Sequence, residues 1–325
     1  MRGRGTTLLV AGLVLLAGMA AADALRDVGG GGDPAPASTP LAVEGVETAA
    51  APDPRRRLAD AGVEGVLYAT AALDAGCEFQ AVGLPELQTT RVFLAPGCRF
   101  DVSPDERHVV FGSPCPADRV VVHALVAGPS WQHVGCSPAW RPDGVLTYVH
   151  DGDVVTARGL RCVDARGAGC SRVVLAGSAL SRALRPFFDA VAVRGFLVRE
   201  IDWFTPDRLV AVVAARPTDE QFVITLERGR LVAPPRVFSP AFTHLRVLPE
   251  RREAVVASAT GFDVVRPDGD FRTSRASPGA RALAYAPDET SYAVAEADDV
   301  CFHDASPGGA MFACVPLVAA DIEWR

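Results

Sequence analysis

The stretch Ala139-Trp140-Arg141-Pro142-Asp143-Gly144 is the clearest of five related copies, and these copies decide the fold. In each copy a short apolar run ends at a proline followed by an acidic residue, and a second apolar run comes next. Proline presets φ for the second position of a type I turn, aspartate suits the third, and glycine can adopt the left-handed conformation that follows. Each copy therefore predicts the tip of a β-hairpin. The five prolines are Pro104, Pro142, Pro206, Pro249 and Pro287.

The interval between most of these prolines is close to the roughly 40 to 45 residues of one four-stranded propeller blade. The strand expected after each proline, such as residues 209–214, is almost entirely apolar, which indicates burial on both faces. Residues 321–325 match a first strand, and residues 65–70 match a second strand that has no partner. We therefore predict an all-β, six-bladed β-propeller that is closed by pairing of the N- and C-terminal strands, which leaves no exposed sheet edge at the closure.

The Pro-acid hairpins resemble those of the TolB-like, WD40-like family of six-bladed propellers, whose hallmark is an aromatic or aliphatic residue, Ser-Pro-Asp-Gly and a hydrophobic strand. The resemblance covers about residues 60–325, and Pro142-Asp143-Gly144 retains the core of the motif. Pro206-Asp207-Arg208 and Pro249-Glu250 are degraded copies. TolB's N-terminal α/β domain has no counterpart in this sequence, so the resemblance implies the propeller fold and does not carry over TolB's partner.

An insertion lengthens the interval between Pro142 and Pro206. Leu180, Ala183, Leu184 and Phe187 have helical spacing, which predicts a helix within residues 178–188. We expect this helix to cap one rim of the propeller. Its apolar stripe either packs against the ring or binds a partner.

The first residues predict export. Arg2 and Arg4 precede an apolar or small stretch at residues 6–22, which is typical of a signal peptide or an uncleaved, single-pass anchor helix. The position of the arginines places the N-terminus inside and the body of the chain outside. We expect a signal peptide or signal-anchor helix at residues 1–25, a flexible Gly/Pro/Ala-rich linker at 26–57, and the propeller at 58–325. The expected location is the extracytoplasmic face of the cell membrane, or outside the cell if the protein is secreted.

Eight cysteines in an exported chain predict disulfide bonds. Two pairs with equal spacing occupy the same places in consecutive blades, and two more pairs fall across single hairpins. The predicted pairs are Cys77 with Cys98, Cys115 with Cys136, Cys162 with Cys170, and Cys301 with Cys314. The alternative for Cys115 and Cys136 is a zinc site with His123 and His133. The parallel pair Cys77 and Cys98 has no intervening histidine, which favours the disulfides.

The composition excludes several kinds of site. The chain contains neither lysine nor asparagine, which rules out Schiff-base lysines, Walker-type phosphate loops and N-glycosylation. A formal net charge of −7 argues against a nucleic-acid partner. The sequence also lacks the motifs Gly-x-Ser-x-Gly and His-Glu-x-x-His. We expect no cofactor and no metal site, and we assign no catalytic residue.

Three charged residues of the expected innermost strands form the candidate site. Asp101, Arg246 and, by alignment, Glu323 lie three positions before the proline of the repeat, in strands that are otherwise mostly apolar. Because charges are seldom buried without a partner, we expect these side chains to line the central channel. They form either a charged ring that binds a peptide terminus or a small anion, or a structural ion pair between blades.

These features predict a non-catalytic, extracytoplasmic β-propeller that serves as a protein-interaction or ligand-binding module at the cell envelope. The alternative is an extracytoplasmic hydrolase or lyase with its site on one rim or in the central channel. The expected partner is an envelope protein of unknown identity. An uncleaved leader would add contact with the membrane.

Overall fold

The computed structural model describes residues 53–74, 76–126, 128–160, 170–188, 193–238, 242–248, 251–258, 261–273, 279–306 and 309–325. The predicted leader, the predicted linker up to residue 52 and the hairpin tip at Pro249 lie outside these ranges. Within these ranges, no helix is long and apolar enough to span a bilayer.

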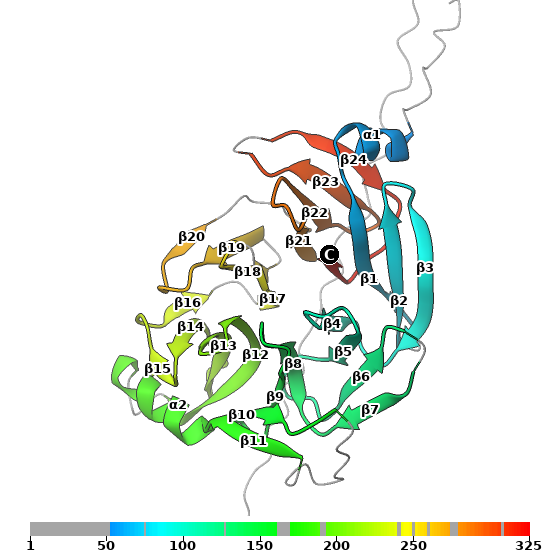
Figure 1. Ribbon diagram of the computed structural model, residues 1–325. Coiled ribbons are helices and arrows are strands. Elements are labelled where there is room, and N and C mark those ends of the chain that lie inside the picture. The colour runs from blue at the N-terminus through cyan, green and yellow to red at the C-terminus, as the bar shows by residue number, and fades with distance from the viewer. Residues whose placement is uncertain are drawn as a thin grey trace, which may run out of the picture. The chain divides into compact units, whose positions relative to one another are not determined.

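The chain from Ala51 onward forms one compact unit that contains six antiparallel sheets arranged in a ring (Figure 1). We name the sheets blades A to F in their order around the ring, and each blade runs from an innermost strand to an outer strand. The innermost strands are β25 (Asp321–Trp324), β4 (Arg99–Val102), β8 (Cys136–Trp140), β12 (Gly195–Thr205), β17 (Phe242–Leu248) and β21 (Ala282–Tyr285). The second strands are β1 (Gly65–Leu73), β5 (His108–Gly112), β9 (Leu146–His150), β13 (Arg208–Arg216), β18 (Glu253–Ser258) and β22 (Ser291–Ala295).

The outer half of each blade completes the sheet. The third strands are β2 (Gly76–Leu84), β6 (Val120–Ala124), β10 (Asp153–Ala157), β14 (Gln221–Glu227), β19 (Gly261–Val265) and β23 (Val300–Asp304). The outer strands are β3 (Gln88–Ala95), β7 (Ser130–His133), β11 (Ser171–Leu175), β15 (Arg230–Leu231), β20 (Phe271–Thr273) and β24 (Met311–Val315). In blade D, β16 (Arg236–Phe238) also pairs with β14. The prediction of an all-β, six-bladed propeller is confirmed.

The second strands are buried on both faces, as their apolar sequences predict. In β13, for example, Val210, Val212 and Val213 are fully buried. Val210 and Val212 pack in an apolar cluster with blade E, whereas Val213 packs on the other face in a cluster with blade C. Burial of apolar surface at roughly 25 cal/mol per Å² makes this face-to-face packing the main favourable term of the fold.

Blade A is built from both ends of the described chain. Strand β25 pairs antiparallel with β1, with Leu67 opposite Trp324 and Ala69 opposite Ile322. The predicted pairing of the two ends is therefore confirmed. All four residues belong to one apolar cluster that continues into blade F. The innermost strand of blade A thus arrives last in chain order and completes the ring.

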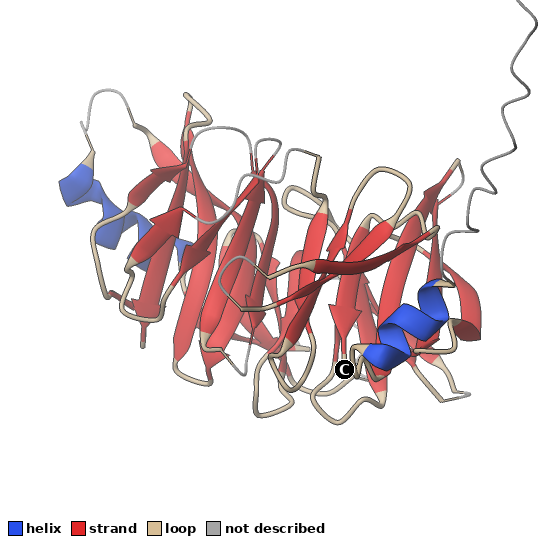
Figure 2. Cartoon of the chain, turned by 90° about the horizontal axis from the view of Figure 1, so that it is seen from above, coloured by secondary structure: helices blue, strands red, loops and turns tan. Residues whose placement is uncertain are grey.

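Two short helices lie at the outer rim (Figure 2). Helix α1 (Pro54–Asp60) begins where Asp53 caps the N–H of Arg55 and proline occupies the first turn, an arrangement that favours helix initiation. Leu58 of α1 is fully buried against blades A and F. The folded unit therefore starts at least four residues before the predicted boundary at residue 58, because α1 begins at Pro54.

The predicted helix after blade C is present as α2 (Gly177–Leu184), followed by the 3₁₀ helix η1 (Arg185–Phe187). Leu180 and Leu184 are buried in the cluster of blades C and D, whereas Phe187 is 48% exposed. Pro186 lacks an N–H and disfavours a continuous α-helix, so the apolar stripe is interrupted before Phe187. Packing against the ring accounts for the first part of the stripe.

Disulfide bonds join three of the predicted pairs: Cys77 with Cys98, Cys115 with Cys136, and Cys301 with Cys314. Because Cys115 and Cys136 are bonded to each other, their sulfurs are not available as thiolate ligands for the zinc alternative. Cys162, half of the fourth predicted pair, lies outside the described residues.

Candidate functional site

Alternate residues of the innermost strands point to the axis of the ring and form two tiers of polar side chains. Side chains two positions apart in a strand face the same way, so each strand contributes to both tiers. The upper tier lies nearer the Pro-Asp hairpins and contains Asp101, Asp202, Arg246 and Glu323. The lower tier contains Arg99, Glu200, His244 and Asp321. Blades C and F place Ala139 and Ala284 at the upper-tier position, as the strand registers show.

Arg246 is the central cation of the site. Its Nη1 lies 2.6 Å from Glu323 Oε2 and 4.0 Å from Asp101 Oδ1. Its Nη2 donates to the carbonyl of Phe100 at 2.7 Å and lies 3.2 Å from Asp321 Oδ2. The guanidinium also lies 5.3 Å from the centroid of the Phe100 ring, within the range of a cation–π contact. The structure thus brings together all three residues predicted to line the channel.

The acidic side chains also bind backbone N–H groups of the next blade. Asp321 and Glu323 of blade A accept hydrogen bonds from the N–H groups of Phe100 and Val102 in blade B, at 3.2 and 3.0 Å. The innermost edge of a sheet has N–H groups with no partner strand, and a buried N–H without an acceptor is costly. The carboxylates supply these acceptors, which explains why acidic residues occupy a buried strand.

Blades C and E receive the same kind of bond. Asp101 Oδ2 accepts from the N–H of Trp140 at 2.6 Å, and Asp202 Oδ2 accepts from the N–H of Val247 at 2.6 Å. We use the term inter-blade bond for a hydrogen bond that an innermost-strand N–H donates to a side-chain oxygen of the preceding blade. These bonds connect blades A to B, B to C and D to E.

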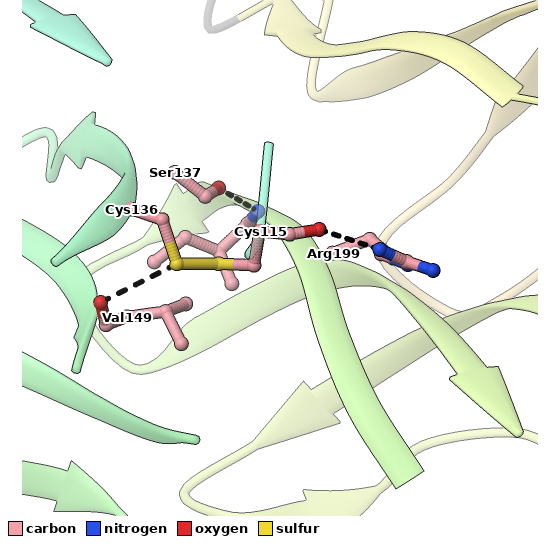
Figure 3. The surroundings of a disulfide bond; sticks show 6 residues. Cys115, Cys136, Ser137, Val149 and Arg199 are labelled. Atoms are coloured by element: carbon pink, nitrogen blue, oxygen red, sulfur yellow. Dashed lines mark hydrogen bonds between the residues drawn. A yellow bond between two sulfur atoms is a disulfide. The ribbon is translucent and has the colours of Figure 1, made fainter. Parts of the chain in front are cut away.

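Between blades C and D the acceptor is a hydroxyl. Ser137 Oγ accepts from the N–H of Ile201 at 2.8 Å, directly beside the disulfide of Cys115 and Cys136 (Figure 3). The carbonyl of Cys115 accepts from Arg199 Nη1 at 2.7 Å, which links blade B directly to blade D. Disulfide, hydroxyl and guanidinium therefore fix one corner of the channel.

Burial and charge act in opposite directions on the carboxyl groups. Burial raises the pKa of Glu200 to about 8 and the pKa of Asp202 to about 6. Burial, with the nearby charges of Glu323 and Asp202, also raises the pKa of Asp101 well above its usual range. Burial would raise the pKa of Glu323 too, but the guanidiniums beside it outweigh burial and lower its pKa. Glu323 is thus the ionised partner of Arg246, whereas Glu200 is protonated at pH 7.

Two cavities adjoin this cluster. The mouth cavity opens on the side of the Pro-Asp hairpins and has a volume of about 470 Å³. Its floor is the upper tier, and its walls include Trp140, Trp203, Trp324 and Tyr285. The floor pocket below it has a volume of about 20 Å³ and is lined by the lower tier. A space of that size holds about one water molecule. Of these two cavities, only the mouth cavity can admit a side chain or a small organic group.

The three tryptophan rings in the wall of the mouth cavity are held in place by hydrogen bonds from their indole N–H groups to protein oxygens. Trp140 Nε1 donates to the carbonyl of Asp101 at 3.1 Å, and Trp203 Nε1 donates to Thr147 Oγ1 at 2.7 Å. Trp324 Nε1 donates to the carbonyl of Glu64 at 2.9 Å. The three rings are held in place and present apolar edges to the mouth cavity.

Sequence reasoning missed Asp202 and the whole lower tier. In blade D the register shifts between Trp203 and Thr205, so one extra residue separates the upper tier from Pro206. Counting back from the proline therefore selects Trp203, but the side chain at the upper tier is Asp202. Aligning the dipeptides Asp202-Trp203 and Glu323-Trp324 on their tryptophans would have found it. The lower tier follows from moving two residues back in each strand.

The fold and the channel together define a six-bladed β-propeller with an acid-rich central site. No family model matches the sequence, and no curated protein matches it. A chain in the crystal structure of a nidogen/laminin complex is similar in fold, with a TM-score of 0.51 and 11% identity, over 80% of this chain and 97% of that one. The β-propeller domain of Cps50 (Swd1) from Myceliophteria thermophila is also similar in fold, with a TM-score of 0.51 and 11% identity, over 80% of this chain and 90% of that domain. At this identity the similarity shows the fold alone.

Proposed function

We propose that this protein is a non-catalytic, extracytoplasmic binding module whose ligand or protein partner docks at the mouth cavity. The observation that carries the proposal is the mouth cavity itself, with its volume of about 470 Å³, rigid aromatic walls and charged floor. Ligand sites are typically concave and largely apolar, with a few convergent polar groups. The mouth cavity has these properties, and it lies on the axis of a ring cross-linked by disulfides.

The carboxyl groups support binding rather than hydrolysis. A general acid or base must reach the reacting atom, directly or through one water molecule. Asp202, Asp321 and Glu323 are each engaged by backbone N–H groups or guanidiniums. Glu200, which has an unpaired oxygen and a raised pKa, lies in the floor pocket of about 20 Å³ and out of reach of a substrate in the mouth cavity. Asp101 does line the mouth cavity with a free oxygen, Oδ1, but no second carboxyl group of the two tiers with a free oxygen stands beside it in that cavity among the described residues. The alternative of a hydrolase or lyase is therefore less well supported.

The disulfides support the proposed location. Three bonded pairs are present among the described residues, and such bonds persist in oxidising compartments outside the cytoplasm. With the apolar stretch at residues 6–22, they favour an exported protein, either tethered to the membrane by that stretch or secreted. The Pro-Asp hairpins also favour membership in the TolB-like, WD40-like group of propellers.

Site-specific photo-cross-linking tests the proposal. The full-length chain carries a photoreactive amino acid at Glu106, an exposed residue of the mouth cavity, or at Glu220, an exposed residue of the β13–β14 turn. The β13–β14 turn lies at the opposite end of the strands from the Pro-Asp hairpins. We expect one defined cross-linked product in the cell envelope from position 106 and none from position 220. Equal cross-linking at both positions, or none at position 106, would contradict docking at the mouth cavity.

A further inference from the structure

Acidic groups outnumber basic groups in the channel. The described residues that line the mouth cavity include four carboxyl groups and two guanidinium groups. The carboxyl groups belong to Asp101, Glu106, Asp202 and Glu323, and the guanidinium groups to Arg246 and Arg325. Below them, Glu200 is protonated at pH 7, and His244 adds no positive charge because burial and the neighbouring guanidiniums lower its pKa well below the usual range. A positive group from outside would offset the excess of carboxyl groups at the mouth cavity, whereas an anion would add to it.

Two guanidiniums already show how the channel binds such a group. Arg246 bonds to Glu323 and to the carbonyl of Phe100, and its face lies over the Phe100 ring. Arg325 donates to Glu323 Oε1 at 2.6 Å and to the carbonyl of Val102 at 3.1 Å. In both cases a carboxylate and an innermost-strand carbonyl bind one planar fork of donors. This geometry suits guanidinium better than a compact ammonium group.

Asp101 and Glu200 have oxygens that are not used in this network. Asp101 Oδ2 binds the N–H of Trp140, whereas Oδ1 is 4.0 Å from its nearest guanidinium nitrogen. The Asp101 side chain is 21% exposed and lines both cavities. Below it, Glu200 Oε2 also has no hydrogen-bond partner among the described residues, but Glu200 lines the floor pocket and not the mouth cavity. The free oxygen of Asp101, beside an open cavity, therefore points to a donor-bearing ligand.

We propose that the mouth cavity binds the guanidinium of an arginine side chain on a protein partner, with Asp101 as its main ion-pair partner and Asp202 as the second acid. This inference rests on the proposed binding function and specifies its ligand chemistry. The aliphatic stem of the arginine packs along Trp140, on the blade C side of the cavity next to Asp101, since arginine stems bury well against apolar surface. No group of three or more His, Cys, Asp or Glu side chains that could hold a metal ion occurs among the described residues.

Titration calorimetry with a minimal probe tests the ligand chemistry on the full-length protein in mild detergent. The probe is N-acetyl-arginine amide, which carries the guanidinium without a free terminus. N-acetyl-citrulline amide has nearly the same shape and no charge, and N-acetyl-glutamate amide carries the opposite charge. We expect at least tenfold tighter binding of the arginine probe than of either control. Equal binding of the citrulline probe, or tighter binding of the glutamate probe, would overturn the proposal.

Matched variants locate the site. Asp101→Asn keeps an oxygen acceptor for the N–H of Trp140 and removes the charge, so we expect at least a tenfold loss of affinity for the arginine probe. Asp153→Asn is the control, because Asp153 Oδ1 likewise accepts from a backbone N–H, that of Gly177, and does not line the mouth cavity. Should Asp101→Asn fail to fold, Glu106→Gln removes an exposed charge of the same cavity, and we expect a two- to threefold loss. Unchanged affinity in the folded variant would overturn the assignment.

The pH dependence provides a separate readout. Asp101 faces Glu323 of the adjacent blade A, and Asp202 and Arg246 of blades D and E across the channel, and burial raises its pKa. Because the guanidinium pairs with the ionised carboxylate, affinity for the arginine probe should rise from pH 5 to pH 8, with uptake of the probe coupled to proton release. Binding that weakens over this range would count against Asp101.

The cross-linking experiment and the titrations with the arginine probe test the two proposals separately. A cross-link at position 106 without preference for the arginine probe would retain the binding module and reject arginine as its ligand. Selective binding of the arginine probe without any cross-linked partner would retain the site chemistry and reject a stable envelope partner.

Discussion

Four seams between blades differ from the other two. The seams from blade A through blade E contain inter-blade bonds, in which Asp321, Glu323, Asp101, Ser137 and Asp202 bind N–H groups of the next blade. We call these the bonded seams. Among the described residues, the two seams of blade F contain no such bond, and we call them the apolar seams.

Blade F is joined to its neighbours through packed apolar side chains. Leu248 and Phe262 of blade E pack with Leu283 and Val294 of blade F. On the other side, α1 and blade A pack with blade F in a single apolar cluster. At the upper-tier position of blade F stands Ala284, which has no group to offer to an N–H.

The difference between the two kinds of seam explains why the centre of this propeller is charged. A bonded seam requires an acceptor in a dry environment, and four of the five acceptors are carboxyl groups. Once buried, they require counter-charges, which Arg246 supplies. The polar channel follows from the way the bonded seams are built, and the upper tier is interrupted at blades C and F, which both contribute alanine.

Removal of Arg246 should cause the largest loss of stability, and it should show the difference between the two kinds of seam most clearly. In Arg246→Leu, Asp321 and Glu323 lose their buried counter-charge, and loss of one partner of a buried ion pair typically costs about 3–5 kcal/mol. Chemical denaturation measures the loss. The matched change on an apolar seam is Arg251→Leu. Arg251 belongs to blade E and is partly exposed, and its Nε lies 3.8 Å from Oε2 of Glu289 at the blade F hairpin. This variant should lose about 0–1 kcal/mol. Similar losses in both variants would show that the seams do not differ.

Loss of the Glu200 proton at higher pH should have an effect of intermediate size on the stability of the fold. The folded protein holds the Glu200 proton up to about pH 8, whereas the unfolded chain releases it near 4.5. This contribution is therefore complete below the unfolded pKa and is lost as the pH rises toward 8, with a slope of up to about 1.4 kcal/mol per pH unit. Thermal melts of Glu200→Gln between pH 5 and pH 8 should show a flatter profile than the natural protein.

A control for the pH effect is Asp105→Asn in a hairpin tip. The hydrogen bond from Ser103 lowers the pKa of Asp105, so its contribution is lost only as the pH falls through that lowered pKa. Between pH 5 and pH 8 this variant should keep the profile of the natural protein. A Glu200→Gln profile as steep as that of the natural protein would refute the role of the lower tier.

The hydroxyl bond between blades C and D should give the smallest effect. Ser137→Ala leaves the buried N–H of Ile201 without its acceptor, and an unsatisfied buried donor costs about 1–3 kcal/mol. Amide exchange at Ile201 should become faster in this variant. Thr290→Ala on blade F removes an exposed hydroxyl that bonds to the exposed Asp288, and it should change stability by less than about 0.5 kcal/mol. Unchanged exchange at Ile201 would mean that the bond is dispensable.

Much of the architecture could be predicted from the sequence, because hairpin chemistry is local. The Pro-acid tips specify turns by backbone preference alone, and the apolar strands after them require burial on both faces. The pairing of Leu67 with Trp324 could be predicted because both end segments matched halves of one repeat. Three disulfide pairs followed from their equal or hairpin-like spacing.

The site was predicted only in part, because it depends on register and on contacts between distant strands. Asp101, Arg246 and Glu323 were identified as isolated charges in apolar strands. The bulge in blade D displaced Asp202 from the expected position, and no local rule reports a bulge of this kind. Which N–H each carboxylate binds depends on the packing of neighbouring blades, and this information is absent from a single strand.

The location of β25 has a consequence for biosynthesis. The last strand in chain order supplies the inner edge of blade A and also the two acids, Asp321 and Glu323, that neutralise Arg246. A nascent chain therefore cannot complete the ring before these residues have left the ribosome. A product of premature termination upstream of Asp321 would expose the edge of β1 and leave an uncompensated cation in its interior. Proteases that attack exposed strand edges could thus distinguish molecules with β25 in place from molecules without it.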